Sequence, residues 1–152
     1  MTARERILIV DDDPFSLTAF EAILAPHFRV ETATGGAQAL SRLDPSRPYA
    51  VIISDMYMPD MDGIDFLARA SVLSPTSVKI MLTGHADLDV AMAAVNRSHV
   101  FGFFSKTCHP AALVAAVRKA LVQHRLLAAR HGRAPSRSAI LSQEEVDFLI
   151  KG

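Results

Sequence analysis

The sequence predicts an α/β fold, a five-stranded parallel sheet doubly wound by helices, and three observations support this prediction. Short apolar runs alternate five times with longer amphipathic segments. A run such as residues 51–53 is apolar at every position, which is typical of parallel strands that helices cover on both faces. Half of the 152 residues are hydrophobic, which is enough to bury the core of one domain. Right-handed crossovers between such strands give an open doubly wound sheet.

Five short runs rich in β-branched or other apolar residues predict the strands. The first ends at three consecutive aspartates, and the second alternates in polarity, as an edge strand can. The third is apolar throughout, and the fourth and fifth are followed by a Thr-Gly pair and a Ser-Lys pair. The expected strands are residues 7–10, 28–32, 51–53, 79–82 and 100–104.

Five amphipathic segments predict the helices that follow these strands. Pro14 opens the first helix and Pro110 the last, because proline is well suited to the first helical turn. The pair Gly35-Gly36 opens the second helix, and the third carries its apolar side chains on one face. The expected helices are residues 14 to about 24, 35–43, 63–73, 88–95 and 110 to about 130.

The composition argues against several classes of protein. The 16 basic and 16 acidic residues give a formal net charge of zero, whereas nucleic-acid binders usually show a large basic excess. The apolar run at residues 7–10 is too short for a signal peptide, and no run approaches a membrane span. The single cysteine, Cys108, rules out an internal disulfide framework and fits a reducing compartment. We therefore expect a cytoplasmic protein that binds neither nucleic acid nor membrane.

The composition changes after the last of these helices. Residues 131–139 lack an apolar period and are typical of a linker, whereas residues 140–152 regain a helical pattern. The charged residues from Arg118 to Arg137 are all basic, which suits a solvated helix C-terminus, and a phosphate- or nucleotide-binding role is the alternative. We expect one domain over residues 1–130, then the linker, then a short peptide-like C-terminal helix.

Polar residues follow four of the expected strands at their carboxyl ends. In a doubly wound sheet these ends converge at one edge, where ligands and chemistry are found. Carboxylates held together repel one another unless a cation compensates, and magnesium with its oxygen ligands suits this task. A lysine would hold a phosphoryl oxygen, and a hydroxyl would add a neutral donor. The set therefore predicts a pocket that places a phosphoryl group on a carboxylate. Its residues are Asp11-Asp12-Asp13, Ser54-Asp55, Thr83-Gly84 and Ser105-Lys106.

Each of these residues alone also has an ordinary structural interpretation. The three aspartates at 11–13 would make a polar turn with a helix N-cap, and Asp55 would be a turn residue. Lys106 would be a solvated surface lysine. The functional interpretation depends on finding these residues together. Four residue types stand at four strand ends in the order that the chemistry needs.

These segments resemble the receiver domain of two-component response regulators over residues 5 to about 125. The spacings match, and so does the loop with the pattern Met-Pro-x-Met-Asp-Gly. The resemblance implies the flavodoxin-like fold of that family. The matching segments are residues 7–14, residues 55–63, residues 81–84 and Lys106.

The resemblance implies a phosphoacceptor and a metal site. Asp55 would accept the phosphoryl group from the phosphohistidine of a histidine kinase. Asp12, Asp55 and the backbone carbonyl of Tyr57 would bind Mg²⁺ directly, and Asp11 would bind it through water.

The resemblance also implies a switch. Lys106 would pair with the phosphate, and Thr83 would turn its hydroxyl toward the phosphate once the acceptor is modified. Phe103 would be the switch aromatic, which packs inward as Thr83 moves. Pro59 and Gly63 would shape the loop after the acceptor.

The chain departs from the family pattern at several positions. Thr107 stands where the family usually has a proline, often after a cis peptide bond. A cis bond before a non-proline residue costs about 2.5–4 kcal/mol, so we expect a trans bond here. Tyr57 and His85 occupy positions that tune water access and hence the phosphoryl lifetime, so that lifetime does not carry over. Phe103 lacks the hydroxyl of a tyrosine.

The last segment combines a Ser-x-x-Glu capping box, a hydrophobic staple and an apolar stripe. Such a short helix is marginal alone in water, so its stripe should dock on another surface. The segment resembles the N-terminal peptide of the flagellar motor switch protein, which in its own family binds the phosphorylated chemotaxis regulator. An extra helix that stabilises the domain is the alternative. The residues concerned are Leu141, Ser142, Glu145, Val146, Leu149 and Ile150.

We therefore expect a single-domain response regulator, not a turnover enzyme, that signals by phosphorylation-dependent protein binding. Chemotaxis or motility is the expected setting, with the flagellar motor switch as a target. Residues 140–150 would dock on the switch face near Phe103, in the same chain or a neighbouring one. A phosphate sink or phosphorelay intermediate is the second hypothesis. A Mg²⁺-dependent phosphotransferase or phosphatase for a small molecule is the third, but it usually needs a cap insertion that the sequence lacks.

Overall fold

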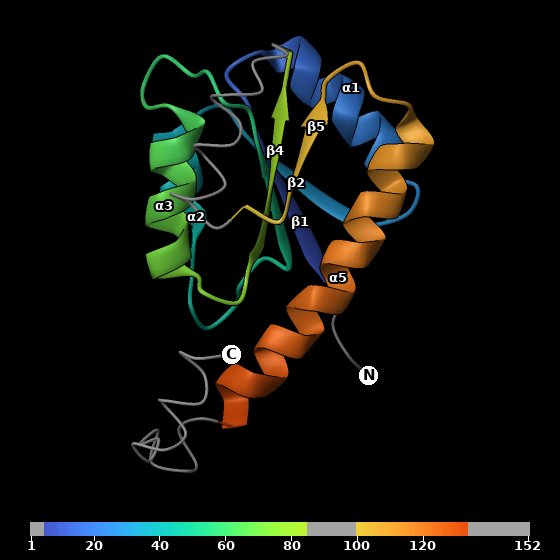
Figure 1. The fold of residues 1–152 in the computed structure, drawn as a ribbon. Helices are drawn as coiled ribbons and strands as arrows, with labels where there is room; N and C mark the ends of the chain where they lie inside the picture. The colour runs from blue at the N-terminus through green and yellow to red at the C-terminus, as the bar shows by residue number, and fades with distance from the viewer. Residues whose placement is uncertain (1–4, 85–99, 134–152) are drawn as a thin grey trace, which may run out of the picture.

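The computed structural model describes residues 5–84 and 100–133, which form one parallel sheet between two layers of helices (Figure 1). The strands lie in the order β2-β1-β3-β4-β5, and each neighbouring pair is parallel. This order changes direction between β1 and β3, which confirms the predicted doubly wound sheet. The strands are β1 Arg6–Val10, β2 Arg29–Ala33, β3 Val51–Ser54, β4 Val78–Thr83 and β5 Gly102–Ser105.

Among the described residues, four helices cover this sheet. Helices α1 and α5 pack on one face, and α2 and α3 pack on the other (Figure 1). The far end of α5 projects beyond the edge of the sheet at which the strands begin (Figure 1). None of the described helices combines the length and the apolar character that a membrane span requires. The helices are α1 Pro14–Leu24, α2 Gly36–Arg42, α3 Gly63–Leu73 and α5 Pro110–Arg133.

The core lies in two layers because side chains alternate across each strand. In β1, Ile7 and Ile9 contact the α1 and α5 layer, whereas Leu8 and Val10 contact the α2 and α3 layer. All four side chains are almost fully buried. Strand β2 lies at an edge of the sheet, which accounts for its alternating polarity.

The predicted bounds are accurate for α1 and α3 and wrong for the start of β5. That strand begins at Gly102 rather than at residue 100. The chain already runs beside β4 at Phe101, whose N–H donates to the Lys79 carbonyl at 2.7 Å, but the regular register starts one residue later. Helix α5 continues past residue 130 to Arg133, the last residue before the undescribed tail, so residues 131–133 of the predicted linker are helical.

Two predicted helices lie outside the described residues. They are the helix at residues 88–95 and the C-terminal helix at residues 140–152. All of the predicted linker beyond residue 133 also lies outside them.

A different loop supplies the N-terminal cap of α2. Asp60, between β3 and α3, accepts hydrogen bonds from the Ala37 N–H at 2.8 Å and the Gly36 N–H at 3.4 Å. Gly35, the residue before the helix, has φ +140° and no side chain that could cap it. A Cβ at Gly35 would lie 3.1 Å from Asp60 Oδ2, so glycine also makes room for the carboxylate. Asp60 therefore ties the loop after β3 to α2.

Replacing Asp60 with alanine should lower the free energy of unfolding by about 1 kcal/mol at neutral pH, the usual effect of losing a helix cap. The Ala37 N–H and its neighbours hold the pKa of Asp60 below its ordinary value. The carboxylate's contribution is therefore complete above the ordinary aspartate pKa of about 3.9 and is lost as the pH falls through the lower folded value. Urea unfolding of both proteins should show a difference that shrinks in acid.

Asp60→Asn is the matched control for this experiment, because its amide oxygen can still accept one of the hydrogen bonds. It should lose less stability than Asp60→Ala at neutral pH. A difference between wild type and Asp60→Ala that is the same in strong acid would show that the carboxylate does not act as the cap.

Candidate functional site

The candidate residues lie at the edge of the sheet where the strands end. Asp11 follows β1, Asp55 follows β3, Lys106 follows β5, and Thr83 is the last residue of β4. The Asp55 N–H donates to the Val10 carbonyl at 3.0 Å, and the Lys106 N–H donates to the Thr83 carbonyl at 2.8 Å. These bonds extend the strand pairing by one residue, so the side chains that follow three strands are positioned by the sheet itself.

Three aspartates form an acidic cluster at this edge. One carboxylate oxygen from each of Asp11, Asp12 and Asp55 lies within 4.8 Å of the other two. Asp11 and Asp55 are buried, whereas Asp12 is exposed. Oxygen donors at this spacing fit a hard divalent cation such as Mg²⁺, which commonly keeps waters in its remaining positions. Tyr57 lies two residues beyond Asp55 in the same loop, and its side chain is exposed.

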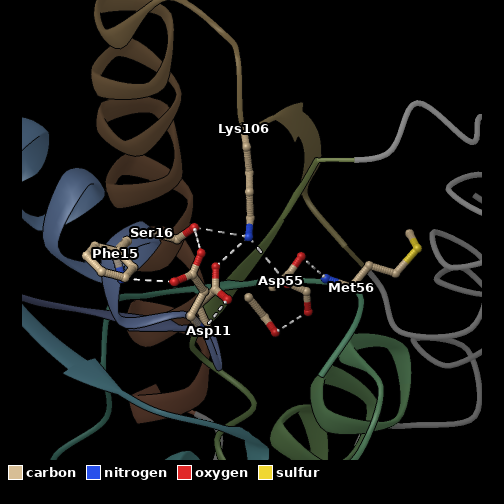
Figure 2. A network of polar contacts seen from close by, with 8 residues as sticks. Asp11, Phe15, Ser16, Asp55, Met56 and Lys106 are labelled. Carbon is tan, nitrogen blue, oxygen red and sulfur yellow. Dashed lines mark hydrogen bonds and ion pairs between the residues drawn. The ribbon is translucent and has the colours of Figure 1, made fainter. Parts of the chain in front are cut away.

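The ammonium of Lys106 points into this acidic cluster (Figure 2). Its Nζ lies 2.6 Å from Asp11 Oδ2 and 3.4 Å from Asp55 Oδ2. Burial lowers the pKa of Lys106, but the two carboxylates outweigh burial and bring that pKa above its ordinary value. The side chain is therefore a stable cation that compensates part of the negative charge.

A backbone hydrogen bond to one oxygen fixes the orientation of the Asp55 carboxylate. Oδ1 accepts a hydrogen bond from the Met56 N–H at 2.8 Å, and Oδ2 lies toward Lys106 (Figure 2). Burial raises the pKa of Asp55 above its ordinary value, and the neighbouring Asp11 carboxylate adds to this, although the Lys106 ammonium opposes it. The geometry leaves Oδ2 directed into the cluster.

Ser16 connects Lys106 to helix α1, and sequence reasoning did not single it out. The Lys106 ammonium donates to Ser16 Oγ at 3.4 Å (Figure 2), and the Ser16 hydroxyl donates to Asp13 Oδ2 at 3.1 Å. Asp13 is the N-cap of α1, and its Oδ1 accepts from the Phe15 N–H at 3.0 Å. The Asp-x-x-Ser spacing was visible in the sequence, but only the fold places Ser16 beside a lysine 90 residues away.

The turn after Lys106 is held by hydroxyl groups. The Lys106–Thr107 bond is trans, as the sequence predicts for a position without proline. Ser105 Oγ and Thr107 Oγ1 lie 2.7 Å apart, and the Thr107 N–H donates to Ser105 Oγ at 3.1 Å. The Cys108 N–H donates to the Ser105 carbonyl at 3.0 Å. These contacts hold the loop, so the lysine reaches the cluster without the proline.

Thr83 and Phe103 lie on neighbouring strands. Thr83 is buried and stands opposite Ser105 in the register of β4 and β5. Phe103 stands opposite Met81 and is partly buried against the core on the α2 and α3 side. His85 lies outside the described residues, as do all the tail residues from Leu141 to Ile150 that the sequence singles out.

Comparisons with known proteins point to one family. The model of the response regulator receiver domain matches residues 7–118. The crystal structure of adenylate cyclase from Rhodopirellula baltica has a TM-score of 0.80 at 38% identity, over 88% of this chain and 98% of that chain. The signal receiver domain of an HD domain-containing protein from Pseudomonas fluorescens Pf-5 has a TM-score of 0.79 at 32% identity, over 86% of this chain and 96% of that one.

The curated relatives are longer proteins. Hydrogenase transcriptional regulatory protein HoxA from Cupriavidus necator is 31% identical over 115 residues, which is 76% of this chain but 24% of HoxA. This chain therefore spans about a quarter of that relative's length.

Gly63 brings the loop after β3 close to the backbone at Asp55. A side chain on Gly63 should therefore distort this loop. The Gly63 N–H donates to the Met56 carbonyl at 2.7 Å, and a Cβ on Gly63 would lie 2.1 Å from the Asp55 carbonyl oxygen. Gly63→Ala should therefore lower the free energy of unfolding by about 1–3 kcal/mol, as overpacking usually does. Urea unfolding measures this change.

Gly84→Ala is the matched control, because a Cβ there would make an ordinary contact of 3.8 Å with Lys106 Cδ. Its effect on stability should stay within about 0.5 kcal/mol. Equal losses in the two variants would mean that the contact with the Asp55 carbonyl does not determine the need for glycine.

Proposed function

Because the chain belongs to the response regulator receiver domain family, we propose that Asp55 accepts a phosphoryl group from a histidine kinase and that the modified protein signals by binding a target protein. The main support is the position of the Lys106 ammonium, 2.6 Å from Asp11 and 3.4 Å from Asp55 within a cluster of three carboxylates. Such a site offers both a nucleophilic oxygen and positive charge for a phosphoryl group.

In the transfer step, Asp55 Oδ2 would attack the phosphorus of the kinase's phosphohistidine. The new O–P bond forms as the P–N bond breaks, and the imidazole leaves and takes up a proton from solvent. Lys106 would pair with a phosphoryl oxygen, and the Asp11 carboxylate would keep the ammonium in place. The Thr83 hydroxyl would donate a hydrogen bond to a second phosphoryl oxygen. These groups act by position and charge, which is the main requirement of phosphoryl transfer.

The residues that would hold Mg²⁺ are those of the acidic cluster. Asp12 and Asp55 would bind it directly together with the Tyr57 carbonyl, and Asp11 would bind it through water. The donor set supports this assignment, since three carboxylate oxygens lie within 4.8 Å of one another. When bound, the ion would neutralise charge on the transferring phosphoryl group.

Thr83 and Phe103 would carry the signal away from the site. Phe103 lies on the strand next to Thr83 and is only partly buried, and it would pack further inward when Thr83 turns toward the phosphoryl group. The change would alter the surface around β5, where a target protein would bind. The protein would act in the cytoplasm as a phosphoacceptor and not as a turnover enzyme.

Within this proposal, the target protein would belong to the flagellar motor, and the sequence of residues 140–150 supports this choice. Their resemblance to the N-terminal peptide of the flagellar motor switch protein suggests a segment that competes with that peptide for the switch face near Phe103. The short linker predicted before this segment would give it a millimolar-scale effective concentration at its own domain.

Asp55→Asn should abolish phosphorylation, because an amide oxygen does not form an acyl phosphate. Wild type incubated with Mg²⁺ and acetyl phosphate should gain the mass of one phosphoryl group, and the variant should gain none. Asp62→Asn is the matched control, since Asp62 lies in the same loop but accepts from the Asp65 N–H at 2.8 Å as the cap of α3. It should be labelled like wild type. A label on Asp55→Asn, or its absence from wild type, would refute the assignment.

Deleting residues 138–152 should strengthen binding of a flagellar motor switch peptide on the order of tenfold, because the internal competitor is gone. The titration uses beryllium fluoride and Mg²⁺ to mimic the phosphorylated state and fluorescence of the labelled peptide as the readout. Leu149→Ser in the full chain should have a similar effect, because it disrupts the apolar stripe without shortening the protein. Equal affinities for all three proteins would exclude competition by the tail.

A further inference from the structure

Lys79 is a charged residue in a fully buried strand. All six residues of β4 are buried, and Lys79 itself is 6% exposed. Its backbone is held by the sheet, opposite Ile52 in β3 and through the 2.7 Å bond between its carbonyl and the Phe101 N–H. Lysine is almost never buried to this degree unless it is paired, so this position calls for a physical reason.

The ammonium of Lys79 has no hydrogen bond or ion pair with any residue that the structure describes. The other buried ionisable side chains in this part of the chain differ in this respect. Asp11 and Asp55 are paired with Lys106, and His124 Nδ1 lies 2.7 Å from the Thr76 carbonyl. Burial lowers the pKa of Lys79, and no carboxylate of the described residues opposes that effect. No described side-chain nitrogen or oxygen is fully buried without a partner, so the ammonium of Lys79 keeps contact with solvent while the rest of its side chain is buried.

A pocket of about 400 Å³ lies beside this lysine, between the end of α3, the start of β4 and α5. Its volume falls in the range of small-molecule sites. Apolar walls come from Pro75, Val78, Phe101 and Leu127, and Phe101 as a residue is 44% exposed. Gln123 adds an amide, and the described lining holds no acidic residue.

The pocket is separate from the acidic cluster. Lys79 precedes Thr83 by four positions along β4, which places its backbone roughly 13 Å from the edge where phosphoryl transfer would occur. None of the residues that line the pocket belongs to the acidic cluster or contacts Lys106.

We propose that this pocket binds a small organic monoanion, a carboxylate with an apolar body, through the ammonium of Lys79. The carboxylate would pair with an ammonium that has no counter-ion among the described residues, and Gln123 would line the pocket beside it. The apolar body would lie against Phe101 and Leu127. One cation in the described lining favours a single negative charge over a dianion. The site is independent of the function proposed for Asp55.

The test is a titration of the full chain with acetate, butyrate and benzoate at up to about 10 mM, followed by two-dimensional ¹H–¹⁵N NMR. Benzyl alcohol is the neutral probe that matches benzoate in shape. At least one carboxylate should shift the amide signals of Val78, Lys79 and Phe101 in a saturable way. Benzyl alcohol should bind at least about tenfold more weakly than benzoate, because it does not supply the counter-ion.

Lys79→Met keeps the length of the side chain without its charge and should weaken carboxylate binding by at least about tenfold. Lys119→Met, at an exposed position of α5, should leave binding unchanged. Both variants should retain wild-type labelling of Asp55, which checks the fold and separates failure of this proposal from failure of the phosphoacceptor assignment. Three results would overturn the proposal: no shift at the pocket with any carboxylate, equal binding of benzoate and benzyl alcohol, or unchanged binding in Lys79→Met. The first two need only the wild-type protein.

Discussion

Charge compensation at one edge of the sheet is the constraint on which the arrangement of this molecule depends. Two buried carboxylates, Asp11 and Asp55, lie close enough to repel each other, and the only strong compensation among the described residues is the ammonium of Lys106. Each partner follows a different strand, so the charges meet only if β1, β3 and β5 lie in the right order and register. A buried pair of this kind contributes little net stability, but an unpaired member is costly, so arrangements that separate these charges are disfavoured.

The surroundings of that edge hold the charged groups in place by local means. Asp13 caps α1 and connects through Ser16 to the lysine, while Asp60 caps α2 and thereby restrains the loop after β3. The hydroxyls of Ser105 and Thr107 shape the turn beyond β5. Helix caps and hydroxyl turns thus provide the rigidity that a site built on loops needs.

Much of this could be predicted from the sequence, and the reasons for the rest are physical. Apolar runs reveal parallel strands because both faces are covered, and residues that follow such strands must gather at one edge, so Asp55 and Lys106 could be brought together without coordinates. The contacts of Ser16 and Asp60 could not, because a hydrogen bond between distant segments leaves no local pattern. The burial of Lys79 was equally invisible, since burial of one lysine depends on what packs around it.

Helix α5 is much longer than the strands of the sheet on which it packs. At 1.5 Å per residue, its 24 residues extend about 36 Å, whereas the six residues of β4 extend about 20 Å. One end of the helix starts four residues after Lys106, and the other projects beyond the opposite edge of the sheet (Figure 1). An exposed ion pair between Arg125 and Glu5, at 2.7 Å, joins this helix to the residue that precedes β1. Because the described helix is longer than the strands it covers, a tilt at its charged end would displace Arg133 through a larger arc than the residues packed on the sheet.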